Sequence, residues 1–336
     1  MFSWQQLQTC RQHFASPMKV HAALSGAGKP PLELVFAGER GGLAFRSEPR
    51  VLAVLEFLFA HPEALPGARA ESRAVLSLEW KGARLGVRAE SDDLAELRQV
   101  WQDDLFRLAE APLQGTVVDL GARTGLFAIR AALLGAARVV ACEPLEEDRQ
   151  QLQRNLALAG VAGKVKVREE TLGLESGKGT CLIYGDDQAE SAAARASGTF
   201  AAATTINLQD LFEQEEIVSC DLLKARLDVP AHLQAMVDAD PLLLRKIKRL
   251  SLAIKPHKES QAALPALRQK LRQAGFNKPD EHEADGLLLV LCDRAPRGTS
   301  GRLARPTSAT GKVERPSARV AVPPSGKDSA KLPRQG

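Results

Sequence analysis

The strongest chemical signal in the sequence is an apolar strand that ends on a carboxylate and turns through two glycines into a helix. The carboxylate is Asp119, and the glycines are Gly121 and Gly125. Glycine at such a turn accepts a positive φ angle and lets a ligand approach the backbone. A second apolar run, residues 139–142, ends on Glu143. Because a carboxylate at the tip of the next parallel strand can bind the hydroxyls of a ribose, the two segments predict a nucleoside-binding crevice.

The charge beside the first glycine indicates which nucleoside would bind. A pyrophosphate needs a three-glycine turn and a helix N-terminus that is free for the anion. Here the pattern is Asp-x-Gly-x-x-x-Gly. A carboxylate in that place repels a pyrophosphate and suits an amine, so the pattern favours S-adenosylmethionine over NAD. The alternative is an ordinary structural turn. The predicted cofactor-binding residues are Asp119, Gly121, Ala122, Gly125 and Glu143.

Composition limits the class of protein. The chain has 336 residues, of which 44% are hydrophobic, enough for one large or two modest domains. It has no run of eighteen apolar residues and no signal-peptide pattern at its start, so we expect a cytoplasmic protein without a transmembrane segment. The five cysteines and six histidines are dispersed. We therefore predict no metal site, and we interpret Glu281-His282-Glu283 as a solvated loop before a strand.

Three parts follow one another along the chain. Residues 1–94 have the pattern of a small α+β region, which includes a hairpin over residues 75–88. Residues 95–296 form the second part. From Thr116 onward they alternate between strand and helix, which predicts a parallel sheet wrapped by helices. Within the chain we expect a helix at 92–109 and strands at 217–223 and 250–254. The last strand, 287–292, is expected to be antiparallel.

The third part, residues 297–336, is rich in Arg, Pro, Ser, Gly and Ala and has almost nothing to bury. It holds nine Lys and Arg residues against two acidic ones. We predict a disordered basic tail. Since the whole chain has a formal net charge of +4, residues 1–296 are net negative. They also lack a stripe of basic and aromatic residues, so a nucleic acid is not the expected partner.

Four motifs in order make residues 95–292 similar to the FkbM family of S-adenosylmethionine-dependent methyltransferases. The clearest is Val-Asp-Leu-Gly-Ala-Arg-Thr-Gly at 118–125, which has Arg123 where the family has asparagine. The resemblance implies an α/β fold, with a Rossmann-like class I methyltransferase sheet and helices on both faces, preceded by the α+β region. It also implies O-methylation of a small hydroxylated acceptor. The other three motifs are residues 100–108, 141–157 and 204–211.

The resemblance weakens on the acceptor side. Where the family has Lys-Ile-Asp-Val-Glu-Gly, residues 224–231 read Lys-Ala-Arg-Leu-Asp-Val-Pro-Ala. In either of two registers Asp228 alone remains of the two carboxylates. The family's Glu-x-His at the fifth strand is reduced to His257. A second hypothesis therefore stays open, namely a methyltransferase-like binding or regulatory domain with weakened catalysis.

Methyl transfer from a sulfonium requires that an acceptor is positioned and that a proton is removed. Asp228 and His257 are both expected just beyond the carboxyl end of a strand, and they are the candidate general bases. Lys224 is expected to orient the acceptor. The structural alternatives are that Asp228 caps the helix after Pro230, and that His257 and Lys224 occupy solvated loops.

Overall fold

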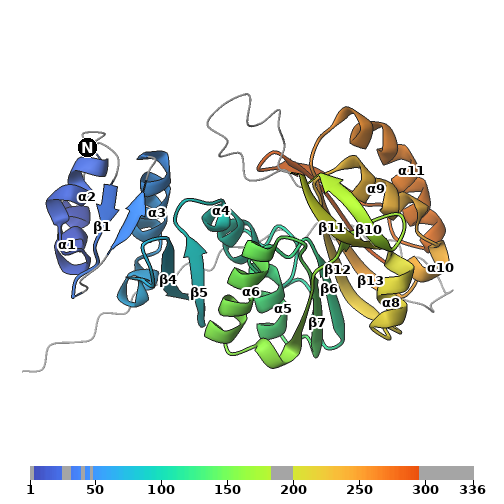
Figure 1. Cartoon of the computed structure of the whole chain (residues 1–336), viewed down its shortest axis with the longest axis horizontal. Helices are drawn as coiled ribbons and strands as arrows, with labels where there is room; N and C mark the ends of the chain where they lie inside the picture. The colour runs from blue at the N-terminus through green and yellow to red at the C-terminus, as the bar shows by residue number, and fades with distance from the viewer. Residues whose placement is uncertain (1–3, 25–31, 39–41, 46–47, 183–199, 295–336) are drawn as a thin grey trace, which may run out of the picture. The chain divides into compact units, whose positions relative to one another are not determined.

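The computed structural model describes residues 4–24, 32–38, 42–45, 48–182 and 200–294 (Figure 1). These residues belong to one compact unit, residues 1–295. The tail at 297–336, for which the sequence predicts disorder, lies outside the described residues. Within the described ranges, no helix combines the length and the apolar character that a membrane span requires.

A seven-stranded sheet has the order β14-β15-β13-β12-β6-β7-β8. Strands β8, β7, β6, β12 and β13 are parallel to one another, whereas β15 is antiparallel to β13 and to β14. The strands are β6 (Thr116–Leu120), β7 (Arg138–Cys142), β8 (Val165–Arg168), β12 (Cys220–Leu227), β13 (Ile247–Ile254), β14 (Asp280–Ala284) and β15 (Leu287–Asp293).

The strand order reverses at β6. The chain runs outward from β6 through β7 to β8 and then returns to β12, on the other side of β6. Ligands of open α/β sheets bind at such a reversal, beyond the carboxyl ends of the strands. The reversal, together with the antiparallel β15 between β13 and β14, defines the Rossmann-like class I methyltransferase fold. The predicted fold class and the predicted antiparallel last strand are confirmed.

Helices cover both faces of this sheet (Figure 1). One face packs against α5 (Leu126–Leu133) and α6 (Glu146–Leu158), and the other packs against α8 (Leu208–Gln214), α9 (Pro230–Asp238), α10 (Pro241–Leu244) and α11 (Lys258–Ala274). Successive side chains of a strand point to opposite faces. Val117 therefore belongs to the first hydrophobic cluster and Val118 to the second.

The N-terminal region shares the first of these clusters, because Leu85 and Phe127 both belong to it. The predicted hairpin at 75–88 is confirmed, with Trp80 opposite Ala83. The predicted division between residues 94 and 95 falls inside α4 and stays a prediction. The elements are α1 (Trp4–His13), α2 (Pro17–Leu24), β1 (Leu32–Leu34), β2 (Leu43–Phe45), α3 (Glu48–Ala60), a 3-10 helix (Pro62–Gly67), β3 (Arg69–Ala70), β4 (Val75–Trp80), β5 (Ala83–Arg88) and α4 (Asp93–Leu97).

The helix predicted at 92–109 is much shorter than expected. α4 continues as one π-helical turn, Arg98–Gln102, and then ends. Asp104 and Arg107 have φ angles of +50° and +54°, which a helix cannot contain. The Asp104 carboxylate accepts the N–H groups of Leu108 and Ala109, at 3.0 and 3.1 Å. These side-chain bonds replace the helical ones and turn the chain toward β6.

Two further expectations are corrected. The strand predicted at 217–223 lies at Cys220–Leu227, so that residues 224–227 are part of the sheet. The segment 281–283, predicted to be a loop, belongs to edge strand β14, because it pairs along its length with β15.

A small sheet of order β10-β11-β9 precedes α8 and was not expected from the sequence. Its strands are β9 (Thr171–Leu172), β10 (Gly177–Leu182) and β11 (Phe200–Ile206).

Candidate functional site

The turn between β6 and α5 has the conformation that its glycines predict. Gly121 and Gly125 have φ angles of +73° and +82°, in a region that favours glycine. The N–H groups of Gly121 and Ala122 both donate to the carbonyl of Cys142 at the end of β7, at 3.0 Å each. A Cβ on Gly125 would lie only 2.8 Å from Cγ of Leu152. Glycine at position 125 therefore allows α6 to pack against the turn.

Glu143 follows β7, is 3% exposed and contacts this turn. Its Oε2 accepts the N–H of Arg123 at 2.7 Å, and its Oε1 accepts the N–H of Leu145 at 2.9 Å. Burial and, secondly, the carboxylate of Asp148 raise the pKa of Glu143 to about 7. Each carboxyl oxygen can accept more than one hydrogen bond. The group is thus held in place by the backbone and keeps the capacity to bind a ribose hydroxyl.

Asp119, at the end of β6, forms a buried ion pair with Lys224 of β12. Nζ of Lys224 lies 2.8 Å from Oδ1 of Asp119 and donates to the carbonyl of Gly121, also at 2.8 Å. The ammonium lies 5.5 Å from the ring centroids of both Phe106 and Phe127, within the range of a cation–π interaction. Burial raises the pKa of Asp119, and Lys224 opposes that shift.

The position of Lys224 distinguishes between its two predicted roles, a residue that orients the acceptor and a solvated loop residue. Its side chain is 2% exposed, so the alternative of a solvated loop residue is wrong. The reason is that β12 extends past Lys224, which brings the residue level with Asp119 in the sheet. Its role in orienting an acceptor stays a prediction, because the ammonium is engaged by Asp119 and Gly121.

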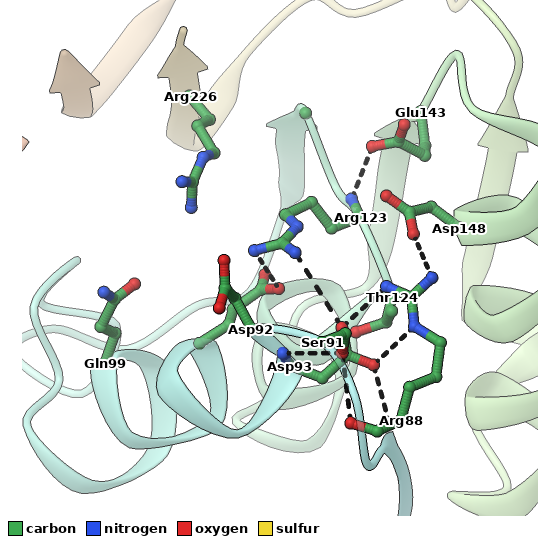
Figure 2. A network of polar contacts seen from close by, with 12 residues as sticks. Arg88, Ser91, Asp92, Asp93, Gln99, Arg123, Thr124, Glu143, Asp148 and Arg226 are labelled. Carbon is green, nitrogen blue, oxygen red and sulfur yellow. Dashed lines mark hydrogen bonds and ion pairs between the residues drawn. The ribbon is translucent and has the colours of Figure 1, made fainter. Parts of the chain in front are cut away.

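Two carboxylates of α4 belong to the same site and were not expected from the sequence. Asp93 and Glu96 have side chains that are 0% and 5% exposed, and they lie 4.0 and 3.7 Å from the guanidinium of Arg123. Burial raises the pKa of Glu96, and Arg123 is the first of the charges that oppose this shift. Figure 2 shows Arg123 between α4 and Glu143. The spacing of three residues, which places both acids on one helix face, is the signal that could have identified them.

Asp228 and His257 are brought together at the ends of β12 and β13. Nε2 of His257 lies 3.0 Å from the carbonyl oxygen of Asp228. The Asp228 carboxylate accepts Nε of Arg226, at 3.1 and 3.2 Å, and its side chain is 37% exposed. The capping residue of α9 is Val229 and not Asp228. The structural alternative for Asp228 is therefore wrong.

The sheet places these two residues at the same edge as Glu143. β12 is two strands from β7, which corresponds to about 10 Å between strand axes. Arg226 lies closest to the turn, since a Cβ on Gly121 would be 3.1 Å from its Cβ. That Asp228, His257 and Glu143 line one pocket stays a prediction.

A small cavity of about 10 Å³ lies elsewhere in the described part of the chain. It is lined by Leu222 and Leu250, which precede the carboxyl ends of β12 and β13, and by Phe106 and Arg249. The cavity is therefore separate from the carboxyl edge, where the predicted residues gather.

The chain is similar to several solved structures. An S-adenosylmethionine-dependent methyltransferase from Agrobacterium tumefaciens shares 16% identity, over 66% of this chain and 70% of that one, with a TM-score of 0.39. An rRNA methylase from Streptococcus thermophilus shares 14%, over 59% and 98%, with a TM-score of 0.40. TrmK from M. capricolum, solved with S-adenosylhomocysteine, shares 11%, over 57% and 67%, with a TM-score of 0.37. These scores are low, so the fold assignment rests on the strand order alone.

No protein-family model and no curated protein matches the chain. The similarity to the FkbM family therefore stays a prediction. The expectation that nucleic acid is not a partner receives no support from these comparisons.

Proposed function

We propose that this chain is an S-adenosylmethionine-dependent methyltransferase that resembles the FkbM family. The observation that supports this most is the contact between the glycine turn and Glu143, at the point where the strand order reverses. A carboxyl group there suits the two hydroxyls of a ribose, and the glycines let a ligand approach the backbone.

The polar groups around the turn fit a cationic cofactor. Oδ2 of Asp119 and Oε2 of Glu96 are buried and have no hydrogen-bond partner among the described residues. Each carboxylate already faces one cation, Lys224 for Asp119 and Arg123 for Glu96, and these two oxygens can still accept a hydrogen bond from an ammonium. S-adenosylmethionine carries an ammonium and a sulfonium, whereas a pyrophosphate would be repelled. We propose that the carboxyl groups of Glu143, Asp119 and Glu96 would hold it. Gly121 and Ala122, whose N–H groups donate to Cys142, would line the site without bonding to the cofactor.

We infer that the acceptor is a small hydroxylated molecule bound near Asp228 and His257. S-adenosylmethionine, when bound, supplies the methyl group. Nε2 of His257 contacts the backbone carbonyl oxygen of Asp228, which can only accept a hydrogen bond. In the neutral imidazole, this contact requires that Nε2 carries the proton. The basic nitrogen is then Nδ1. A histidine held in this tautomer can remove the proton of a hydroxyl group that lies within hydrogen-bond reach.

A second candidate function is a binding or regulatory domain that keeps the cofactor but not the reaction. It is favoured by the pairing of Arg226 with Asp228, since the guanidinium already occupies the carboxylate that would act as a base. Cofactor binding without methyl transfer to any hydroxylated acceptor would support this candidate over the first.

Calorimetric titration with S-adenosylmethionine and S-adenosylhomocysteine tests cofactor binding. We expect the wild type to bind both, and we expect Glu143→Ala to weaken binding by about 1.5 to 3 kcal/mol, the range for hydrogen bonds to a charged group. Glu147→Ala is the matched control, because Glu147 is an exposed carboxylate four residues further along the chain. Equal affinities of wild type and Glu143→Ala, or tight NAD binding by the wild type, would contradict the assignment.

A further inference from the structure

The outer edge of β5, in the N-terminal region, is bound by side chains of α6. β5 is an end strand in the order β3-β4-β5, and end strands leave backbone groups without a strand partner. The N–H of Gly86 donates to Oδ1 of Asn155 at 2.8 Å, and its carbonyl accepts Nδ2 of Asn155 at 3.0 Å and Nε2 of Gln151 at 3.2 Å. The asparagine amide thus takes the place of a neighbouring strand.

The same asparagine also holds the glycine turn. Its Nδ2 donates to the carbonyl of Thr124, at 3.0 Å, and the residue is fully buried. A Cβ on Gly86 would lie 2.8 Å from Nε2 of Gln151 and 3.0 Å from Oδ1 of Asn155. A Cβ at position 86 would therefore push the amide ends of Gln151 and Asn155 away from these bonds. We call this arrangement of Gly86, Thr124, Gln151 and Asn155 the Gly86 clamp.

A second link leads from β5 to the turn through Arg88. Its guanidinium donates to both carboxylate oxygens of Asp93, at 2.8 and 2.9 Å, and pairs with Asp148 at 2.7 Å. Asp93 in turn lies 4.0 Å from the guanidinium of Arg123, and the backbone N–H of Arg123 donates to Glu143 at 2.7 Å. Figure 2 shows this series of contacts, which connects β5 with the carboxyl group that we propose binds ribose.

We propose that β5 positions the cofactor crevice, so that cofactor affinity depends on Gly86 and Arg88 of the N-terminal region. The inference rests on the proposed function, because it takes the crevice to be the binding site for S-adenosylmethionine. Disruption of the Gly86 clamp, or of the contacts of Arg88, leaves a buried polar or charged group without its hydrogen bond. The glycine turn between β6 and α5 must then shift to compensate. Linkage is reciprocal, so bound cofactor also stabilises the Gly86 clamp.

Titration of the full chain with S-adenosylhomocysteine measures this dependence. We expect Gly86→Ala and Arg88→Ala to weaken binding at least about tenfold. The added Cβ displaces the amides of Asn155 and Gln151 from the Gly86 backbone, and the loss of the guanidinium leaves the buried Asp93 without its donor. Arg84→Ala is the matched control, since Arg84 lies on the same strand but pairs with the exposed Glu79. We expect its affinity to equal that of the wild type. Equal affinities for all four proteins would overturn the inference.

Hydrogen exchange at the Arg123 amide supplies a readout that a purely structural role of β5 would leave unchanged. We expect the Arg123 amide to exchange faster in Gly86→Ala and Arg88→Ala than in the wild type, at temperatures well below the midpoint of thermal unfolding. In the wild type, S-adenosylhomocysteine should slow exchange at the Gly86 amide. If the two variants lower only the midpoint of thermal unfolding, and change neither affinity nor exchange at Arg123, the links are structural and the inference is wrong.

The two proposals can fail separately. A wild type that binds neither S-adenosylmethionine nor S-adenosylhomocysteine contradicts the proposed function, yet exchange at Arg123 in the ligand-free variants still decides whether β5 positions the turn. Should Gly86→Ala not fold, Arg88→Lys replaces it, because lysine keeps the charge but cannot donate to both oxygens of Asp93 in the same geometry.

Discussion

The two halves of the carboxyl edge differ in how their functional groups are held. On the β6–β7 side, Asp119 and Glu143 are almost completely buried, and Glu143 is held by backbone N–H groups. On the β12–β13 side, the Asp228 side chain is 37% exposed and pairs with Arg226, two residues away in the chain.

The difference shows which half is organised before any ligand arrives. Groups that backbone donors fix in a buried environment keep their geometry and interact strongly with a ligand. An exposed ion pair between neighbours is screened by water and contributes little to a fixed geometry. We therefore expect substitutions beside the turn to affect folding and cofactor binding, and substitutions at the ends of β12 and β13 to affect turnover.

The largest effect is expected for the ion pair between Asp119 and Lys224. Lys224→Met leaves the buried Asp119 carboxylate without its cation, and we expect a loss of about 3 to 5 kcal/mol in the free energy of unfolding. Urea denaturation measures it.

The matched control for this prediction is Lys248→Met. Lys248 pairs with Asp221 at 2.7 Å, but its side chain is 61% exposed, so the expected loss is at most about 1 kcal/mol. Similar losses for the two lysine variants would mean that Lys224 is not a buried partner of Asp119. The contrast between the two halves would then disappear.

Titration of Glu143 provides a test that depends on pH. Burial raises its pKa from 4.5 to about 7 in the folded chain, so between these values the folded state binds more protons than the unfolded state, and stability falls as the pH rises. Glu143→Gln removes this titration. The stability of wild type relative to Glu143→Gln should fall by up to about 3 kcal/mol over this interval and stay constant above and below it. A flat difference would show that Glu143 is not desolvated.

Turnover tests the acceptor side. If Asp228 and His257 bind the acceptor or remove its proton, alanine at either position should lower the rate of methyl transfer by at least about 100-fold, with unchanged cofactor affinity. Asp238→Ala and His282→Ala are controls, because both residues are exposed. Full activity of the Asp228 and His257 variants would remove both from the proposed site, and loss of cofactor binding would show that the two halves are not independent.

The local sequence pattern was sufficient to predict those parts of the fold that are formed by residues close together in the sequence. The glycine turn, the hairpin at 75–88 and the position of Glu143 after the next parallel strand follow from hydrophobic periodicity, from the backbone freedom of glycine and from the rule that parallel strands end at one edge. The antiparallel β15 follows from the same periodicity and from the resemblance to the methyltransferase family. These features are confirmed because few distant residues can override them.

The remaining features depend on contacts between residues that are distant in the chain. Lys224 is buried because β12 extends beyond its predicted end and brings the residue level with Asp119. The carboxylates of α4 meet Arg123, and Gly86 meets Asn155 across 69 residues. The sequence by itself determined the glycine turn, the 75–88 hairpin and the alternation of strands and helices around the turn. Tertiary packing decided which charges are buried together, because burial and pairing depend on where distant elements meet.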